Sequence, residues 1–309
     1  MTTHSLIRLG TRGSPLALAQ AHETRQRLAL AHGFDPASVE IIVIKTTGDQ
    51  IQDLALALAG GKGLFTKEID AAMLEGAIDI AVHSAKDLPT RMPEGIVVAG
   101  YLPREDVRDA LISAKASSIA GLPHGASLGS ASLRRQAMML RLRPDLKPQL
   151  LRGNVGTRLR KVESGEIDVT LLAIAGLKRL GLAHRASAVL EVADFLPAVG
   201  QGAIAITARS GDERTAAVLD AILHVETAHA LAAERAFLDM LDGSCRMPIA
   251  GHAHLHAGHL SFRGAIYALD GAQAFEASIE GGARDGARLG AEAGRDIRAR
   301  APASMFLAA

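Results

Sequence analysis

The chain has 309 residues, of which 48% are hydrophobic and 22% are charged, with 34 Lys and Arg against 33 Asp and Glu. This length predicts two or three domains with hydrophobic cores of their own. The nearly balanced charge argues against a protein held on nucleic acid by bulk charge. The single cysteine excludes an intramolecular disulfide and a site of several thiolates on one metal ion.

The N-terminal segment and the apolar runs predict the cellular location of the protein. MTTHSLIRLG (1–10) lacks a basic region followed by an apolar one, so we expect no export signal. The longest apolar run, near Val169–Leu177, is far shorter than the roughly 20 residues that a membrane span requires. We therefore expect a cytoplasmic protein that does not bind a membrane.

The first two-thirds of the chain alternates strand-like runs with helical patterns, which predicts α/β layers on mainly parallel sheets. Strands are predicted at Ser5–Leu9, Val39–Ile44, Ile78–Val82 and Ile96–Ala99, and helices at Pro15–Leu30 and Thr66–Glu75. The pattern then recurs. LEGAIDIAVHSA (74–85) aligns with ESGEIDVTLLAIA (163–175), and LGTRGS (9–14) is echoed by LGSAS (128–132). This repeat predicts two related α/β domains.

Two connectors divide the chain further. LPREDVRDALIS (102–113) leads into the second repeat, and FLPAVGQGAIAI (195–206) leaves it for a strand that could rejoin the first sheet. A helix predicted over Thr227–Leu241 is followed by short alternating strands and an Ala/Arg-rich helix, which predicts a small α+β domain. The predicted domains are residues 1–102 with 200–220, residues 103–199, and residues 221–309.

Arginines collect where a predicted strand gives way to a helix. They are Arg12 in GTRGSP, Arg134 and Arg135 in GSASLRRQ, and Arg152 and Arg158 in LRGNVGTR. Ser14 before Pro15 is a good N-cap, and Ser130, Ser132 and Thr157 could act in the same way. Helix N-termini and arginine forks both suit carboxylates or phosphates. Three such turns favour a binding site for a polyanionic ligand over the alternative of ordinary helix caps with solvated arginines.

Two further segments carry candidate groups. HSAKDLPT brings Ser84, Lys86 and Asp87 to a predicted strand end, where they are either turn formers or a reactive pair. GGKGLFTKE (60–68) lacks the spacing of a nucleotide-binding loop and instead predicts a lid that presents Lys62.

Two other motifs leave a choice open. His252, His254 and His256 share one face of a predicted strand, for which an exposed edge strand is a simpler explanation than a metal site. Cys245, in the turn DGSCRMPIAG, is either a small buried hydrophobe or a thiol held in a turn.

Several segments together resemble the porphobilinogen deaminase family. They occur in the family's order and span most of the chain. They are TRGSPLALAQ (11–20), GGKGLFTKE, AVHSAKDLPT (81–90), REDVRDA (104–110), GSASLRRQ (129–136), LRGNVGTRLRK (151–161), LAIAGLKRLG (172–181), LPAVGQGA (196–203) and the Cys245 turn.

The resemblance implies two α/β domains like periplasmic binding proteins and a smaller C-terminal α+β domain. It also implies that four porphobilinogen molecules are deaminated and joined head to tail into the linear tetrapyrrole hydroxymethylbilane, with release of ammonia. The family grows this chain on a dipyrromethane cofactor held through a cysteine thioether, and Cys245 falls at that position. No metal is implied. The product would pass to uroporphyrinogen-III synthase.

The resemblance also assigns roles to residues. Asp87 matches the family's catalytic aspartate, which stabilises the cationic azafulvene that forms when ammonia leaves. Lys86 and Arg12 are the other two catalytic positions that the resemblance implies. The cofactor-binding positions are Ser84, Lys86, Asp87, Ser130, Ser132, Arg134, Arg135, Arg152, Gly153 and Arg158. The substrate-binding positions are Arg12, Ser14, Phe65, Arg152, Arg158, Arg179 and Gln201, and Lys62 belongs to the lid.

The chain departs from the family's pattern at three positions. Leu58 replaces a frequent lysine of the lid, Ala131 replaces a hydroxyl residue beside the cofactor, and Ser244 replaces a frequent glycine before Cys245. We expect activity to survive, with altered lid behaviour.

Two other functions compete with the enzyme. An anion-binding module without chemistry would need the arginines but neither Asp87 nor Cys245. RNA binding is disfavoured, because the chain has only 7 Phe, 2 Tyr and no Trp for base stacking. No heptad seam is visible, so we expect a monomer.

Overall fold

The computed structural model describes residues 7–47, 66–243 and 247–306. The chain divides into two compact units. Unit 1 comprises Met1–Ile51, Gly61–Glu105 and Ala203–Ala228, and unit 2 comprises Gln52–Gly60, Asp106–Gly202 and His229–Ala309. Most of the predicted second and third domains falls within unit 2, although residues 103–105 and 221–228 belong to unit 1, and the predicted boundaries stay a prediction.

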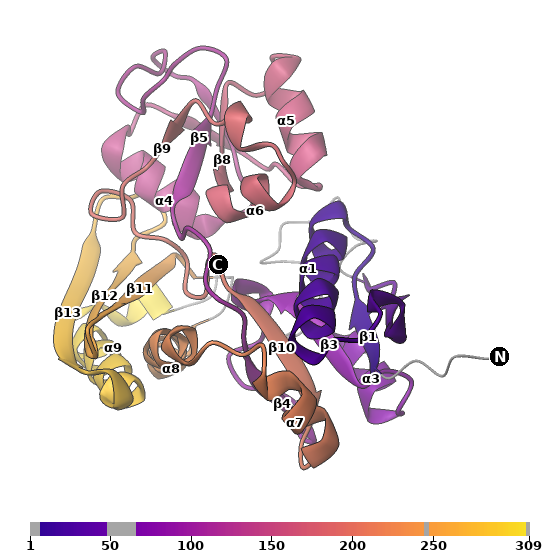
Figure 1. The fold of residues 1–309 in the computed structure, drawn as a ribbon. Coiled ribbons are helices and arrows are strands. Elements are labelled where there is room, and N and C mark those ends of the chain that lie inside the picture. Colours follow the sequence, from indigo (N-terminus) through magenta and orange to yellow (C-terminus); the bar gives the residue numbers. More distant parts are fainter. Residues whose placement is uncertain (1–6, 48–65, 244–246, 307–309) are drawn as a thin grey trace. The chain divides into compact units, whose positions relative to one another are not determined.

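Unit 1 is built on a five-stranded sheet in the order β2-β1-β3-β10-β4 (Figure 1). Its strands are β1 (Ile7–Thr11), β2 (Val39–Val43), β3 (Ile80–Ser84), β4 (Ile96–Tyr101) and β10 (Ile204–Arg209). The helices of this unit are α1 (Pro15–His32), α3 (Lys67–Leu74) and α7 (Glu213–Asp220). As the sequence predicted, the strand after the second connector, β10, returns to this sheet and pairs with β3 and β4.

Unit 2 repeats this scheme with a five-stranded sheet in the order β7-β6-β8-β5-β9. Its strands are β5 (Asp109–Ile112), β6 (Ser127–Gly129), β7 (Lys147–Gln149), β8 (Val169–Ala173) and β9 (Ala188–Val189). The helices α4 (Leu133–Leu142), α5 (Val155–Glu163) and α6 (Ile174–Arg179) follow β6, β7 and β8. The central strands β3 and β8 come from the two segments that the sequence aligned, so the predicted repeat is confirmed.

The repeat extends to the turns. Gly76 follows α3 and Gly165 follows α5, and both take left-handed φ angles, 75° and 76°, before a central strand begins. In each case the glycine N–H donates to a carbonyl of the last helical turn, to Met73 and Val162 respectively. Glycine adopts this conformation without the steric cost that a Cβ brings, which explains its place in both turns.

Each five-stranded sheet is mainly parallel, as predicted, but one strand in each runs in the opposite direction. β1 is parallel to β2 and β3, but β10 is antiparallel to both of its neighbours, and β5 is antiparallel to β8 and β9 in the same way. The difference has a topological cause. β5 and β10 are the first strands after the chain crosses from one unit to the other, so their direction is not set by a local strand–helix–strand unit.

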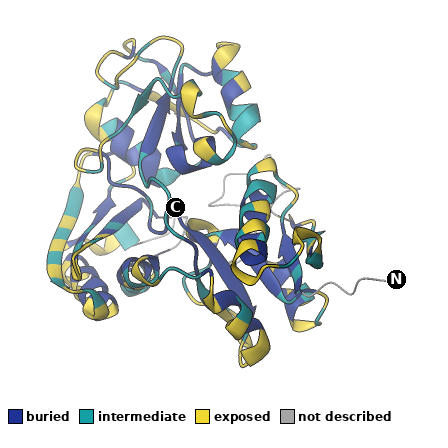
Figure 2. Ribbon diagram, in the orientation of Figure 1, coloured by how far each residue is buried: buried dark blue, intermediate teal, exposed yellow. Residues whose placement is uncertain are grey.

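The C-terminal part of unit 2 is an antiparallel sheet in the order β11-β12-β13, as the predicted α+β domain requires. It comprises β11 (Ile249–His256), β12 (His259–Tyr267) and β13 (Ala274–Gly282), with α8 (Val225–Met240) and α9 (Gly286–Arg300) as its helices. β13 alternates between half-buried and exposed residues, visible as bands in Figure 2. Such alternation is expected of a strand with one solvated face.

The hydrophobic cores follow these layers. In unit 1, Leu9, Ile80 and Ile206 come from three neighbouring strands and pack with Leu28 of α1. In unit 2, Met139 of α4 shares one core with Tyr267 of β12, so α4 joins the two sheets of that unit. Among the described residues no single helix is long and apolar enough to cross a membrane, although α7 and α8 together, as a sharply bent pair, meet the length and composition criteria.

Candidate functional site

The candidate residues of unit 1 meet at one edge of its sheet. β1 and β3 are parallel neighbours, so their carboxyl ends lie at the same edge. Arg12 and Ser14 follow β1, while Ser84 ends β3 and Asp87 lies in the short helix Ala85–Asp87 directly after it. The strand pairing therefore places together residues that are about 70 positions apart in the sequence.

These residues line a pocket. Its lining comprises Arg12, Ser14, Leu16, Ala17, Gln20, Thr66, Val82, His83, Ser84 and Asp87. The Arg12 Nη1 and Asp87 Oδ2 atoms are 4.0 Å apart, and both side chains remain partly exposed, at 20% and 38%. A cation and an anion in loose contact at a pocket wall can both still bind a ligand. Lys86, in the same short helix as Asp87, is exposed and does not line this pocket.

Ser14 and Ser84 have different local roles in this pocket. The Ser14 hydroxyl caps α1 by accepting a hydrogen bond from the Ala17 N–H at 3.3 Å, as the sequence predicted. The Ser84 hydroxyl oxygen lies 3.0 Å from Nε2 and 3.2 Å from Oε1 of Gln20, whose side chain is buried on α1. The sequence reasoning missed Gln20, although a polar residue on the buried face of an amphipathic helix was a usable signal.

His83 was also missed, because it lies inside an apolar strand pattern. It is buried on β3, where its Nε2 lies 3.3 Å from the Thr207 hydroxyl of β10. Burial, and after it the positive charge of Arg12, lower the pKa of His83 to about 4. The pocket therefore contains a neutral imidazole beside the Arg12–Asp87 pair at neutral pH.

The free energy of unfolding should depend on pH through His83. Between pH 6.5 and about 4 the unfolded chain binds a proton that the folded protein does not. The His83 contribution is thus present above pH 6.5 and is lost as the pH falls to about 4, by up to about 3 kcal/mol. His83→Gln, which can still bond Thr207, should flatten the pH profile of chemical denaturation in this window. His22→Gln, at an exposed position of α1, should not; equal profiles for wild type and His83→Gln would contradict the assignment.

Unit 2 holds the second group, again at the carboxyl ends of parallel strands. Ser130 and Ser132 follow β6, and Arg134 and Arg135 lie in the first turn of α4. The Ser132 hydroxyl accepts from the Arg135 N–H and caps α4, whereas the Ser130 hydroxyl accepts from the Ser132 N–H before the helix begins. Thr157 was predicted as a cap of α5, but Asn154 fills that position by accepting from the Thr157 N–H at 2.9 Å.

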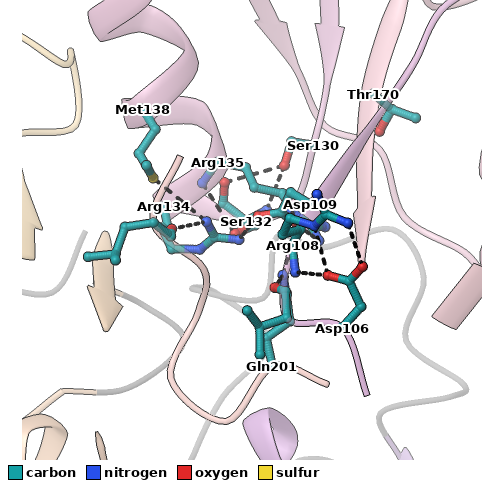
Figure 3. A network of polar contacts seen from close by, with 12 residues as sticks. Asp106, Arg108, Asp109, Ser130, Ser132, Arg134, Arg135, Met138, Thr170 and Gln201 are labelled. Carbon is teal, nitrogen blue, oxygen red and sulfur yellow. Dashed lines mark hydrogen bonds and ion pairs between the residues drawn. The ribbon is translucent and has the colours of Figure 1, made fainter. Parts of the chain in front are cut away.

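Arg134 and Arg135 are not solvated caps. Both are buried, at 4% and 6% exposure, and both donate to the carboxylate of Asp109 (Figure 3). Burial raises the pKa of Asp109, but the charges of the two arginines outweigh this and hold it well below its usual range. Asp109 was not predicted as a site residue. An acid at the first position of the otherwise apolar strand β5 was the only local signal for it.

The remaining candidates of unit 2 lie after β7, in α5, at the end of α6 and next to Gly202. Arg152 and Gly153 follow β7, with Gly153 at a left-handed φ of 108°, and the Arg158 Nε donates to the Gly153 carbonyl at 2.9 Å. At the end of α6, the Arg179 Nη2 donates to the Gly202 carbonyl at 3.2 Å. The neighbouring Gln201 is buried, and its Nε2 donates to the Val107 carbonyl and to Asp109.

Some predicted residues lie outside the described part of the chain. They are Leu58, Lys62, Phe65, Ser244 and Cys245. His252, His254 and His256 lie on β11, where the rings of His252 and His254 are 6.4 Å apart. Within residues 7–47, 66–243 and 247–306, no three His, Cys, Asp or Glu side chains gather as metal ligands do.

Comparison with known proteins gives the relatives of this chain. A solved periplasmic substrate-binding protein of an ABC transporter from Coxiella burnetii is similar with 18% identity and a TM-score of 0.44, over 70% of this chain and 91% of that one. The porphobilinogen deaminase of Nitrobacter hamburgensis is 57% identical over 304 residues, which cover 98% of this chain and 96% of that protein. That of Paracoccus denitrificans is 54% identical over 300 residues, 97% of this chain and 96% of that protein.

Two family models also match. The porphobilinogen deaminase dipyrromethane cofactor binding domain matches residues 7–217, and the porphobilinogen deaminase C-terminal domain matches residues 228–299. The two matches together cover both five-stranded sheets and the three-stranded sheet. They also cover the sequence segments that carried the resemblance. The chain belongs to the porphobilinogen deaminase family.

Proposed function

We propose that this protein deaminates four porphobilinogen molecules and joins them head to tail into hydroxymethylbilane, starting from a dipyrromethane bound covalently to Cys245. The observation that carries the proposal is the match of residues 7–217 to the cofactor-binding domain of the family. Within that span, both sheets present arginine and hydroxyl side chains at the carboxyl ends of their parallel strands. This is the edge at which α/β sheets bind their ligands.

The residues present fit a ligand that carries several carboxylates. In unit 2 the two buried guanidinium groups of Arg134 and Arg135 share one carboxylate, which leaves an excess positive charge in a place with little water. The Arg134 Nε is buried and has no acceptor in the described part of the chain. An orphaned buried donor with an excess of positive charge is what an incoming carboxylate would satisfy.

The residues that would hold the dipyrromethane are those that the sequence assigned to it. Cys245 would bind it covalently, and Ser84, Lys86, Asp87, Ser130, Ser132, Arg134, Arg135, Arg152, Gly153 and Arg158 would bind its acetate and propionate groups and its pyrrole nitrogens. When bound, the dipyrromethane supplies the terminal pyrrole α-carbon to which each substrate unit is added.

In unit 1 the pocket side chains act on the arriving porphobilinogen. The Arg12 guanidinium and the Ser14 end of α1 bind its carboxylates, because both offer N–H or O–H donors and Arg12 adds a full positive charge. The Asp87 carboxylate accepts hydrogen bonds from pyrrole N–H groups and stabilises the positive charge that develops as ammonia leaves. Gln20 fixes the Ser84 hydroxyl, and the neutral His83 adds no competing charge.

Further roles complete the proposal. Arg152, Arg158, Arg179, Gln201 and Phe65 would contact substrate, and Lys62 would belong to a lid over it. We also propose a cytoplasmic monomer whose product passes to uroporphyrinogen-III synthase. The support for these statements is the family membership together with the sequence patterns that predicted them.

Intact mass tests the proposal directly. Wild-type protein from a host that makes porphobilinogen should be heavier than its sequence by one dipyrromethane, and Cys245→Ser protein from the same host should have the mass of its sequence. The serine hydroxyl is far less nucleophilic than a thiolate, so the attachment should be lost almost completely. An unmodified wild-type protein would instead favour the anion-binding module, which needs the arginines but no covalent primer.

A further inference from the structure

Asp109 lies at the centre of the unit 2 network, yet no role in the reaction has been assigned to it. It is the first residue of β5 and is completely buried. Because β5 is antiparallel to β8, Asp109 lies opposite Ala173, the last residue of β8. This pairing brings its carboxylate to the sheet edge that carries Ser130, Ser132 and the start of α4, as Figure 3 shows.

Four N–H donors converge on this one carboxylate. Oδ1 accepts from the Arg135 Nε at 3.1 Å and Nη2 at 2.6 Å, and from the Gln201 Nε2 at 3.1 Å. Oδ2 accepts from the Arg134 Nη2 at 2.7 Å. Three of these donors share Oδ1 and one binds Oδ2, so the number of N–H groups equals the roughly four lone-pair positions of an ionised carboxylate.

The two guanidinium groups are fixed to different degrees. Arg134 also donates to the Leu196 carbonyl at 2.8 Å and lies over the Phe195 ring at 5.7 Å. Within the described residues, the Arg135 guanidinium group has Asp109 as its only hydrogen-bond acceptor, reached through Nε and Nη2. The Arg135 Nη1 atom has no acceptor among those residues. Asp109 thus sets the position of Arg135 and leaves part of that cation for another anion.

The Asp109 carboxylate also connects the two arginines to the two chain crossings, the points at which the chain passes from unit 1 into unit 2 and back again. Gln201 donates to Asp109 and also to the Val107 carbonyl at 2.8 Å. Val107 lies just after the crossing into unit 2, and Gln201 lies just before the crossing out of it. The amide of Gln201 therefore ties the two crossings to each other and to the Asp109 carboxylate.

We propose that Asp109 is a positioning residue for cofactor capture: it presets the Arg134 and Arg135 guanidinium groups, and the Gln201 amide between the chain crossings, before a cofactor carboxylate arrives. The inference rests on the proposed function, because it takes the dipyrromethane as the anion. Without the carboxylate the two neighbouring cations repel each other, and Arg135 loses its fixed orientation. Donors that are already in place bind an anion without a further ordering cost, which is the advantage that Asp109 provides.

The test compares Asp109→Asn with a matched variant of the same unit. Asp168 also accepts several hydrogen bonds, from Lys115 and from the Ser127 N–H and hydroxyl, but it directly precedes β8 and so lies at the opposite sheet edge. Asp168→Asn should lower the melting temperature while the soluble protein carries as much cofactor as wild type by intact mass. Asp109→Asn should lower the cofactor-loaded fraction of soluble chains about tenfold or more.

A second variant covers the case in which Asp109→Asn does not fold. Arg135→Lys keeps the buried positive charge but cannot form the two-pronged contact with Asp109. We expect a folded protein with a clearly reduced loaded fraction, and loading equal to wild type would overturn the inference. Equal loading of folded Asp109→Asn would overturn it as well. If wild-type protein itself carries no dipyrromethane, the proposed function fails instead, so the two failures are distinguishable.

Discussion

Asp87→Asn should retain the cofactor and lose most of its turnover, by about 10²–10³-fold, which is the usual effect of removing one preorganised group that stabilises developing charge. The substitution keeps the size and the hydrogen-bonding ability of the side chain but removes its negative charge. The fold should survive, because the contact of Asp87 with Arg12 is loose, at 4.0 Å, and partly exposed. The loss should therefore appear in kcat, with the intact mass still showing a loaded protein.

A matched control separates this effect from a general change of charge. Asp220 is an exposed carboxylate at the end of α7 in the same unit, and Asp220→Asn should leave kcat, KM and loading unchanged. Near-normal turnover of loaded Asp87→Asn would refute the catalytic role. A variant that carries no dipyrromethane would show that Asp87 acts first in cofactor binding.

Gly290→Ala should destabilise the folded protein by about 3 kcal/mol. Gly290 lies in α9, where an added Cβ would stand 1.9 Å from the Ala233 carbonyl oxygen and 2.7 Å from its carbon in α8. These are backbone atoms, which cannot rotate away as a side chain can, so the two helices would have to separate. The loss of contacts between α8 and α9 should outweigh the gain of about 1 kcal/mol that alanine offers over glycine within a helix.

Gly156→Ala provides the comparison. This glycine lies in α5, where an added Cβ would meet nothing closer than the Asn154 side chain at 3.5 Å. We expect it to be neutral or to stabilise by up to about 1 kcal/mol. Chemical denaturation of both variants measures the difference, and a Gly290→Ala protein as stable as wild type would show that α8 and α9 are not packed as closely as described.

The excess positive charge of the Asp109 network connects stability with cofactor binding. Two buried cations on one carboxylate are a costly arrangement in an unliganded protein. An anion that binds there relieves this cost, so loaded protein should be more stable than the cofactor-free form. Sites that bind charged ligands commonly carry such local instability, because the same uncompensated charges that weaken the fold bind the ligand.

Local patterns in the sequence determined much of this protein. Apolar periodicity located β1, β2, β3, α1 and α8 to within a few residues, and Ser14 and Ser132 cap their helices as predicted. The internal repeat predicted two similar sheets, and their equivalent strand orders confirm it. These features depend on residues that are close in sequence, namely helical or strand spacing and the hydrogen bonds at a helix end. Residue types at strand ends also indicated an anionic ligand.

Only the tertiary structure decided which groups meet. The antiparallel direction of β5 and β10, the contact of Gln20 with Ser84 and the burial of His83 against Thr207 all join residues far apart in sequence. The sequence placed Arg134 and Arg135 correctly at a helix start, but it did not reveal that they are buried on Asp109, about 25 residues earlier. The apolar periodicity of a segment indicates its own secondary structure. The partner of a buried charge depends instead on which strands pair, and no local pattern contains that information.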